Sequence, residues 1–509
     1  MIQQKIQTQL KNILNSFLAG EYANVSTLFD TVAQTIDGCE LSENDMSQLS
    51  KLLSIFFVGQ LVDLPTLNRI TTYCGISSNN VQKKDTALCK ILTNKHLHAL
   101  YEGVFEHILT QQLGALLSKH ASILSRELVT VVLDDSVFKM WLASQMEVLD
   151  VDKCDFYKQA FSGQMQQVVW GYQVVVLGIN IGEVFFPLYF ECVRKTVASI
   201  TEEQVKHATI VANWKQECAK RSTLIAEIKG KKAVSTTNED RKEVKALRIS
   251  LKILNVTIKE LKIKAKSSKP SKKIPEKTAV AVKLMHKVGV FIEKIRKNHP
   301  DMADLNFSCD NGYSHKALLD AAPECHLTYI SVPKKGHYFT IDGEKITLLD
   351  YIETVYKPAE TAYDVAQKAV STDKKVPFTM RVRGHYDALA CDVTILIFRL
   401  LNSKKVTAIY TPNKNIFAKT LRRHWFARTQ IEQFFKMLKH FMHIAETRPR
   451  EKHSFEYKML RFAFIALQIK QFIRILRKKR LLPPKAALGT LRIILATLPF
   501  IREILYSLL

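Results

Sequence analysis

The chain has 509 residues, which is enough for two to four domains and more than one sizeable core. Its composition is 47% hydrophobic and 24% charged, a balance that excludes a largely disordered protein. Lysine and arginine outnumber aspartate and glutamate by 74 to 48, giving a formal charge of +26. This charge predicts a polyanionic partner, most simply nucleic acid, with an anionic membrane surface as the weaker alternative.

The sequence predicts no membrane-spanning segment and no signal peptide. The most apolar stretch, residues 168–190, contains Glu183, Pro187 and many β-branched residues, so it predicts strands rather than a membrane span. The first residues lack the pattern of a signal peptide. Nine cysteines occur without a C-x-x-C pair, which is typical of a reducing compartment and argues against a zinc ribbon. We therefore expect a cytoplasmic protein that makes no membrane contact.

Positive charge is concentrated in two windows. By direct count, residues 241–300 carry 18 basic and 4 acidic side chains, and residues 421–480 carry 16 and 4. The two windows thus hold +14 and +12, which together equal the charge of the whole chain. The polyanion is expected to bind there.

Residues 1–125 predict a helical domain, because apolar residues recur at helical spacing. Within it, residues 67–92 could form a helix-turn-helix that contacts DNA. Gly75 would break the chain, and Ser77 or Ser78 would cap a second helix that carries three lysines. Two packed helices of an all-α domain explain the pattern equally well.

Residues 126–445 mix strand and helix patterns and predict a catalytic core with two insertions. Strands are expected, in chain order, at 128–133, 168–181, 183–192, 305–309, 327–332, 337–341, 378–382, 392–400 and 406–410. Helices are expected at 277–298 and 419–444.

The two insertions differ in composition. The first, 201–275, is helical and basic, with a heptad seam at 244–261. The second, 326–411, is rich in β-strands, and the tail 446–509 is helical and basic.

Three acidic residues stand at positions suited to one chemistry. Asp135 and Asp310 follow predicted strands, and Glu432 lies on the predicted helix 419–444. Phosphodiester cleavage near neutral pH needs an activated nucleophile and compensation of charge on phosphorus. Two Mg²⁺ ions about 4 Å apart supply both when carboxylate oxygens hold them.

The predicted helix around Glu432 has one narrow polar stripe. At about 100° per residue, Trp425, Arg428, Glu432 and Lys439 share this stripe, with Lys436 beside it, and the apolar residues lie on the opposite side. A carboxylate on the stripe could bind metal while the neighbouring cations grip DNA phosphates.

The spacing Trp425-x2-Arg428-x3-Glu432-x6-Lys439 resembles the Tyr-x2-Arg-x3-Glu-x6-Lys signature of a large group of bacterial insertion-sequence transposases. Leu-Asp-Asp-Ser at 133–136 and Cys-Asp-Asn-Gly-Tyr at 309–313 resemble that group's other two motifs. In the first motif the aspartate before Ser or Thr is the ligand, which favours Asp135 over Asp134. The resemblance covers about residues 128–445. It departs at Trp425, where the signature has Tyr, and in the long gap between the two aspartates.

The resemblance implies an α/β (α+β) protein with an RNase H-like mixed sheet core, and a DNA transposase of the DDE class. Such an enzyme cleaves transposon ends and joins the freed 3′-hydroxyl to target DNA. It would bind terminal inverted repeats and target duplex near the bacterial nucleoid, as a homodimer on paired ends, with Mg²⁺ or Mn²⁺, most simply two ions. The residues carried over are the catalytic, metal-binding Asp135, Asp310 and Glu432 and the DNA-binding Trp425, Arg428, Lys436 and Lys439.

Two alternatives stay open: an RNase H-like nuclease that cuts without joining, and a non-catalytic DNA-binding protein derived from a transposase. For a two-metal site, the carboxyl groups of Asp135, Asp310 and Glu432 should lie within about 4–8 Å of one another. At least one of the clustered carboxyl groups should then show a raised pKa. Asp134 should face away, because neighbouring residues of a strand point to opposite sides.

Overall fold

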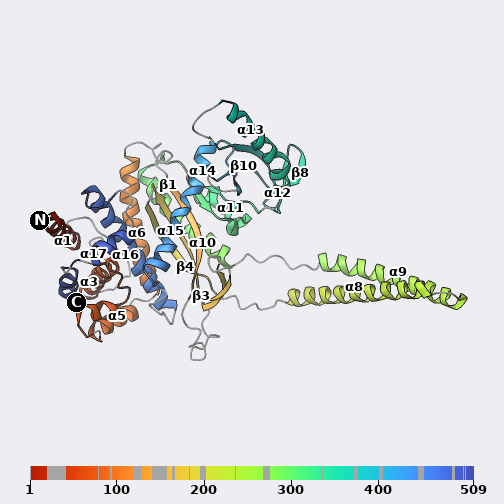
Figure 1. The fold of residues 1–509 in the computed structure, drawn as a ribbon, viewed down its shortest axis with the longest axis horizontal. Helices are drawn as coiled ribbons and strands as arrows, with labels where there is room; N and C mark the ends of the chain where they lie inside the picture. The colour runs from red at the N-terminus through yellow and green to blue at the C-terminus, as the bar shows by residue number, and fades with distance from the viewer. Residues whose placement is uncertain are drawn as a thin grey trace. The chain divides into compact units, whose positions relative to one another are not determined.

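The structure of the chain is a computed structural model (Figure 1). It describes residues 2–19, 42–77, 79–91, 94–118, 129–139, 157–162, 167–182, 184–194, 202–234, 237–267, 276–334, 336–370, 377–400, 405–444, 452–483, 488–496, 498 and 500–509. The chain forms two compact units, Met1–Lys195 with Glu276–Leu509, and Thr196–Pro275.

A six-stranded mixed sheet forms the centre of the larger unit. Its strands are β1 (Val129–Lys139), β2 (Tyr157–Ser162), β3 (Gln167–Ile181), β4 (Val184–Cys192), β5 (Leu305–Cys309) and β6 (Leu327–Ile330). They follow the order β2-β3-β1-β5-β6, and β4 pairs with β3. The pairs β1–β5 and β5–β6 are parallel, whereas β3 runs antiparallel to its neighbours β1, β2 and β4. The predicted mixed α/β class is confirmed.

Strand β1 continues beyond its predicted end at residue 133. It pairs with β3 from Val129↔Ile181 to Lys139↔Gly171, so the backbone around Asp134 and Asp135 is part of the sheet. Both aspartates therefore alternate as strand residues do, with side chains on opposite faces.

Different elements flank the two faces of the sheet at this point. On one face, α14 (Ala418–Ala427) contacts β1 and β5, and α15 (Thr429–Lys436) contacts β1. The buried His424 of α14 lies 2.7 Å from the Thr130 hydroxyl and 3.0 Å from the Asn306 amide, which are register partners in β1 and β5. On the other face, α10 (Glu276–Asn298) and α11 (Lys316–Glu324) pack together, and α10 contacts β3.

The helix predicted at 419–444 is interrupted at Arg428. Arg428 ends α14 and precedes α15, and a π-helical turn, η4 (Met437–Phe441), follows α15. At the junction the amides of Arg428 and Ile431 donate to carbonyls three residues earlier, Trp425 and Arg428, so the helix tightens locally.

A second, antiparallel sheet makes up the predicted β-rich insertion. Its order is β11-β10-β9-β7-β8, with strands β7 (Tyr338–Ile341), β8 (Glu344–Thr347), β9 (Thr379–Tyr386), β10 (Cys391–Arg399) and β11 (Val406–Thr411). A bridge between Ser331 and Tyr410 connects it to the region of β6. It also contains helical segments that the pattern did not predict: α12 (Leu348–Tyr351), η3 (Ile352–Tyr356) and α13 (Lys357–Val370). An ion pair between Arg399 and Glu360 holds α13 to β10.

Helices from both ends of the chain pack together (Figure 1). They are α1 (Ile2–Leu18), α3 (Glu43–Leu61), α4 (Leu67–Cys74), α5 (Asn79–Ile91), α6 (Asn94–Leu117), α16 (Lys452–Lys478), α17 (Leu488–Ala496) and α18 (Phe500–Leu508). Arg461 of α16 donates to Asp85 of α5 at 3.1 Å. The predicted turn between α4 and α5 begins at Gly75 in a left-handed conformation, whereas Ser78 lies outside the described residues. No helix in the described parts of the chain is long and apolar enough to cross a membrane.

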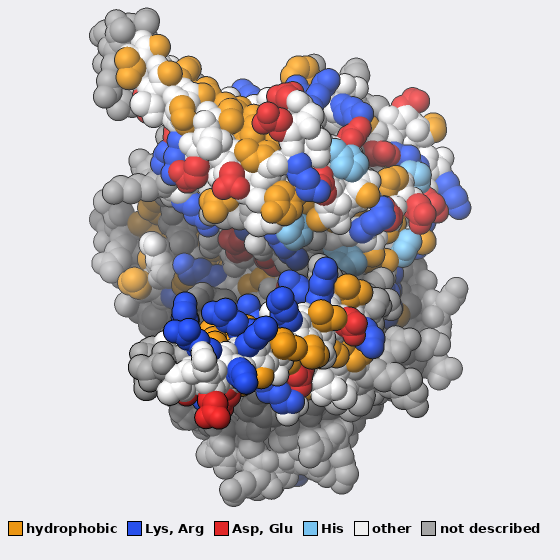
Figure 2. Space-filling model, turned by 90° about the vertical axis from the view of Figure 1, so that its right-hand side faces the viewer, with side chains coloured by type: hydrophobic (Ala, Val, Ile, Leu, Met, Phe, Trp, Pro, Cys, Tyr) orange, Lys and Arg blue, Asp and Glu red, His pale blue; other side chains and the backbone are white. Residues whose placement is uncertain are grey.

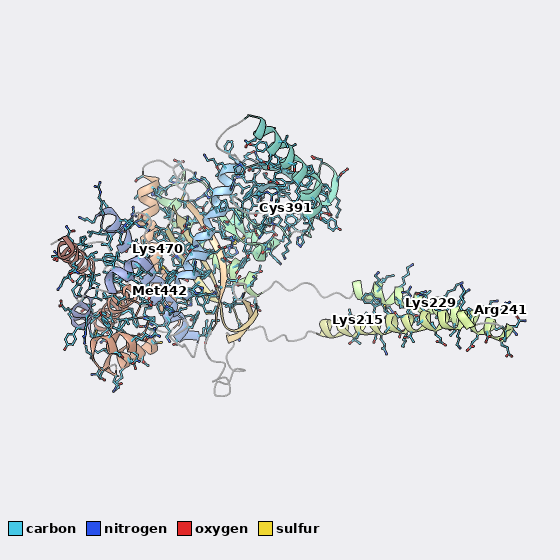
Figure 3. All side chains as sticks on the ribbon, viewed as in Figure 1. Lys215, Lys229, Arg241, Cys391, Met442 and Lys470 are labelled. Carbon is cyan, nitrogen blue, oxygen red and sulfur yellow. The ribbon has the colours of Figure 1, made fainter. Side chains whose placement is uncertain are left out.

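The smaller unit is a helical hairpin of α8 (Glu202–Val234) and α9 (Asn238–Ser267). Val244, in the predicted heptad seam, is buried, and Arg221 of α8 donates to Asn255 of α9 at 2.8 Å. Lysine and arginine side chains are abundant on its visible face (Figure 2) and extend along its length, for example at Lys215 and Lys229 (Figure 3). The first basic window therefore falls partly on this hairpin.

Candidate active site at two parallel strands

Asp134 and Asp310 lie side by side on neighbouring parallel strands. The β1–β5 pairing runs from Thr130↔Asn306 to Leu133↔Cys309, and each aspartate is the next residue of its strand path. Among the neighbouring charges, that of Asp310 raises the pKa of Asp134 most, and Asp310 lines a cavity together with Trp425 and Arg428. Asp310 directly follows β5, as predicted, and accepts a hydrogen bond from the Gly312 amide at 2.8 Å.

Arg428 connects Asp134 to Glu432. One of its guanidinium nitrogens lies 3.4 Å from Asp134 Oδ2, and another lies 2.7 Å from Glu432 Oε1. The Asp134 side chain is only 13% exposed, whereas that of Glu432 is 46% exposed. The helix junction at Arg428 thus positions one cation between a buried carboxylate from the sheet and an exposed one from α15.

The carboxyl group of Asp134 has a raised pKa. Burial, the negative charge of Asp310 and that of Asp135 raise its pKa from 3.8 to about 7, although Arg428 opposes the shift. A carboxyl group with such a pKa is only partly ionised near neutral pH. A cation bound beside it would offset most of the free-energy cost of ionising this buried carboxyl group.

Asp135 has a different environment on the opposite face. Its Oδ1 accepts from the Tyr313 hydroxyl at 2.9 Å and from Lys277 Nζ at 3.3 Å, and its Oδ2 accepts from the Gln173 amide at 2.6 Å. The Lys277 ammonium also lies 4.8 Å from the centre of the Tyr313 ring. Donors from β3, from α10 and from the turn after Asp310 therefore satisfy this carboxylate.

The predicted DNA-binding residues occupy both buried and exposed positions near the aspartates. Lys439 Nζ lies 5.2 Å from the Phe138 ring centre, and burial lowers its pKa to about 8, although the two aspartates of β1 oppose the shift. Lys436 is exposed on α15. Trp425 packs edge-on against Phe398 of β10, with ring centres 5.9 Å apart.

A cavity of about 370 Å³ adjoins Asp310. Trp425 and Arg428 line it together with residues of the second sheet and its helices. Among the described residues, the buried Trp425 Nε1 and Arg428 Nε have no hydrogen-bond partner. This cavity therefore presents polar groups beside a largely apolar wall.

The expected three-carboxylate cluster is not formed in this structure. Within the described residues, which include every carboxylate named above, no three His, Cys, Asp or Glu side chains converge as a metal-binding group. Asp135 accepts hydrogen bonds from Tyr313, Lys277 and Gln173, and Glu432 pairs with Arg428. The prediction that Asp134 faces away is wrong, because β1 continues through both aspartates and turns Asp134 toward Asp310 and Arg428.

The pattern analysis missed four residues that shape this region: His424, which joins α14 to the sheet, and the donors Gln173, Lys277 and Tyr313 around Asp135. Their partners are 38 to 294 positions away in the chain, so no local spacing pointed to them. Strand alternation through Asp134-Asp135 was the one signal available.

No curated protein matches the chain. Residues 282–468 match the family model of the transposase DDE domain, a segment that contains Asp310, Arg428 and Glu432 and begins after β1. Together with the geometry of the two parallel strands, this match supports a DDE transposase family for the chain.

Proposed function

We propose that the protein is a DNA transposase, which cleaves transposon ends and joins the freed 3′-hydroxyl to target DNA. The observation that carries the proposal is the placement of Asp134 and Asp310 on neighbouring parallel strands, with Arg428 leading from Asp134 to Glu432. The transposase DDE domain match spans two of these three acidic residues.

The residues present fit a hard divalent cation at the sheet. Carboxylate oxygens are the ligands that Mg²⁺ and Mn²⁺ prefer, and burial together with the charges of Asp310 and Asp135 outweighs Arg428 and keeps the pKa of Asp134 raised. When bound, one or two such ions would supply an activated hydroxyl nucleophile and neutralise charge on the phosphate. Asp310 and one aspartate of β1 would hold them, and Glu432 would complete the site after Arg428 moves to a DNA phosphate.

The sheet supports one choice between the two aspartates of β1. The motif pattern favours Asp135 as the ligand, whereas the position beside Asp310 on the neighbouring strand and the contact with Arg428 favour Asp134. We therefore propose Asp134 as the first ligand. Asp135, fixed by three donors, would hold the end of β1 in register with the turn that carries Asp310.

The remaining predicted contacts belong to the same proposal. Arg428, Lys436 and Lys439 would grip the DNA backbone beside the reacting phosphate, and Trp425 would border the path of the strand. Duplex DNA is the partner, both as terminal repeat and as target. Joining two ends implies a homodimer on DNA.

A product assay tests the proposal. Purified protein is incubated with labelled duplexes from the ends of the element that encodes it, a supercoiled plasmid and Mg²⁺ or Mn²⁺. The transposase proposal requires label joined covalently to the plasmid. Cut ends without joining would establish the nuclease alternative, and binding without cutting would establish the non-catalytic one.

A further inference from the structure

An exposed cationic strip lies on the second sheet, away from the carboxylates. Arg381 and Arg383 stand two residues apart on β9, so their side chains leave the same face, and both are exposed. On the opposite face of the strand, Tyr386 is fully buried. The strip is therefore an outward surface of a strand whose other side is anchored in the core.

The turn before α14 holds the two arginines in place. The Lys414 carbonyl accepts hydrogen bonds from Arg381 at 2.6 Å and from Arg383 at 3.2 Å. A guanidinium has five N–H donors, and each of these contacts uses a single nitrogen. Both groups are thus pre-positioned while keeping donors for a ligand.

Asp392, an acidic residue that contacts the same turn, is paired with two basic side chains. Asp392 of β10 accepts from His385 at 3.0 Å and from Lys414 at 3.3 Å, and these contacts lower the pKa of its carboxyl group. It therefore leaves the positive potential of the arginines largely intact.

An aromatic ring projects from the same turn. Phe417 is 77% exposed, more than any other large hydrophobic side chain among the described residues. Its neighbour Ile416 is only 8% exposed and belongs to a small core cluster with Phe398 and Leu421, so the turn is anchored. A fixed, exposed aromatic beside pre-positioned arginines is typical of surfaces that bind nucleic acid.

Helix α14 relates this strip to the carboxylate site. It begins directly after Phe417 and ends at Arg428, which contacts Asp134 and Glu432. Eleven residues of α-helix span about 16 Å, which corresponds to about five base pairs at roughly 3.4 Å each. A duplex with its reacting phosphate at Arg428 would reach the strip if it ran along α14.

We propose that Arg381, Arg383 and Phe417 form a second DNA contact about five base pairs from the reacting phosphate. The arginines bind backbone phosphates, and the Phe417 ring packs against deoxyribose. The proposal rests on the DNA-binding function proposed above, and it assigns that function a surface outside the carboxylate site.

The test measures binding of the full chain to a short fluorescent duplex of arbitrary sequence, by anisotropy over a salt series without divalent metal. Arg381→Ala/Arg383→Ala should lower the log–log salt slope by about 1.8, because each lost phosphate contact removes about 0.9. Phe417→Ala should weaken binding about fivefold with an unchanged slope, because an apolar contact releases no counter-ions.

Two matched controls separate a local contact from general loss of charge or fold. Lys51→Ala/Arg502→Ala removes two exposed charges, one from α3 and one from α18, outside both basic windows, and Tyr506→Ala removes an aromatic ring of α18 that is 64% exposed. Both should bind like the wild type. If the arginine and Phe417 variants bind like the wild type, the proposal that this strip contacts DNA is wrong. Wild-type protein that binds no duplex at all would instead overturn the proposed function.

Discussion

The two aspartates of β1 are neighbours in sequence and opposites in environment. Asp134 faces α14 and α15, is largely buried and lies 3.4 Å from the Arg428 guanidinium, and its pKa is raised to about 7. Asp135 faces α10 and receives hydrogen bonds from Gln173, Lys277 and Tyr313. The carboxyl group of Asp134 has a raised pKa, whereas three hydrogen bonds hold the carboxylate of Asp135 in place.

This difference supports the proposal that Asp134 is the reactive position and Asp135 a supporting one. A buried charge without sufficient partners destabilises a fold and is tolerated where a ligand later compensates it. A carboxylate with three donors stabilises the structure and has little reason to exchange them for a metal. The comparison therefore assigns ligand binding to Asp134 and positioning to Asp135, and each prediction below can break it.

The largest expected effect is on catalysis. Asp134→Asn should reduce metal-dependent nicking of end DNA by about 10³-fold or more, because it removes a ligand that stabilises the transition state. Asp135→Asn should cost much less, about 10-fold, because it loosens the site without removing a ligand. Single-turnover cleavage with Mg²⁺ and with Mn²⁺ measures both. Near-normal cleavage by Asp134→Asn together with an inactive Asp135→Asn variant would instead favour Asp135 as the ligand, as the motif pattern does.

A second contrast concerns the α14/α15 face. Glu432→Gln should keep DNA binding and lose cleavage by about 10²–10³-fold, since the amide cannot replace an ionised ligand. Lys439→Ala should instead weaken the complex with end DNA, because it removes a phosphate contact. Anisotropy and single-turnover rates on the same preparations give both numbers. Loss of binding by Glu432→Gln with residual cleavage would reverse the two roles.

Stability should respond to the two aspartates with opposite sign. At pH 8 Asp134→Asn should stabilise the fold by about 3 kcal/mol, because its pKa near 7 means that the ionised carboxylate is costly when buried. The pKa is raised in the folded state, so this gain should vanish as the pH falls toward 4. Asp135→Asn should cost about 1 kcal/mol through lost hydrogen bonds.

Denaturant unfolding without metal at pH 8 and pH 5 measures these differences. Destabilisation by both variants at pH 8 would show that Asp134 is structurally satisfied, and the contrast between the two faces would then fail.

The smallest expected effect concerns His424, which packs on the Asp134 face. Burial lowers its pKa from 6.5 to about 4, so the folded state keeps the ring neutral while the unfolded state protonates it. The stability contribution is therefore present above pH 6.5 and lost as the pH falls toward 4. Between pH 7 and pH 5 the loss is about 2 kcal/mol. The difference in unfolding free energy between wild type and His424→Gln should shrink by that amount over this range; an unchanged difference would mean that the ring is solvated.

The local pattern of apolar and turn residues predicted many of the strands and helices. The strand at 305–309 lies where it was expected, because it is a short run with apolar residues at alternate positions and turn residues follow it at 310–312. The helix α10 begins within one residue of its predicted start, because its apolar side chains recur at helical spacing. The break at Arg428 and the helix α13 were missed, because both depend on contacts with other elements, such as Asp134 and Arg399.

By itself the sequence determined the mixed class, the positions of most strands and the candidates Asp310 and Glu432, because periodicity, turn residues and motif spacing are local properties. Only the tertiary structure distinguishes the two aspartates of β1. Alternation guarantees that Asp134 and Asp135 point to opposite faces, but which face meets α14 depends on pairing with β5, a strand more than 160 residues away. Charge, burial and hydrogen bonds then differ because the two faces meet different helices.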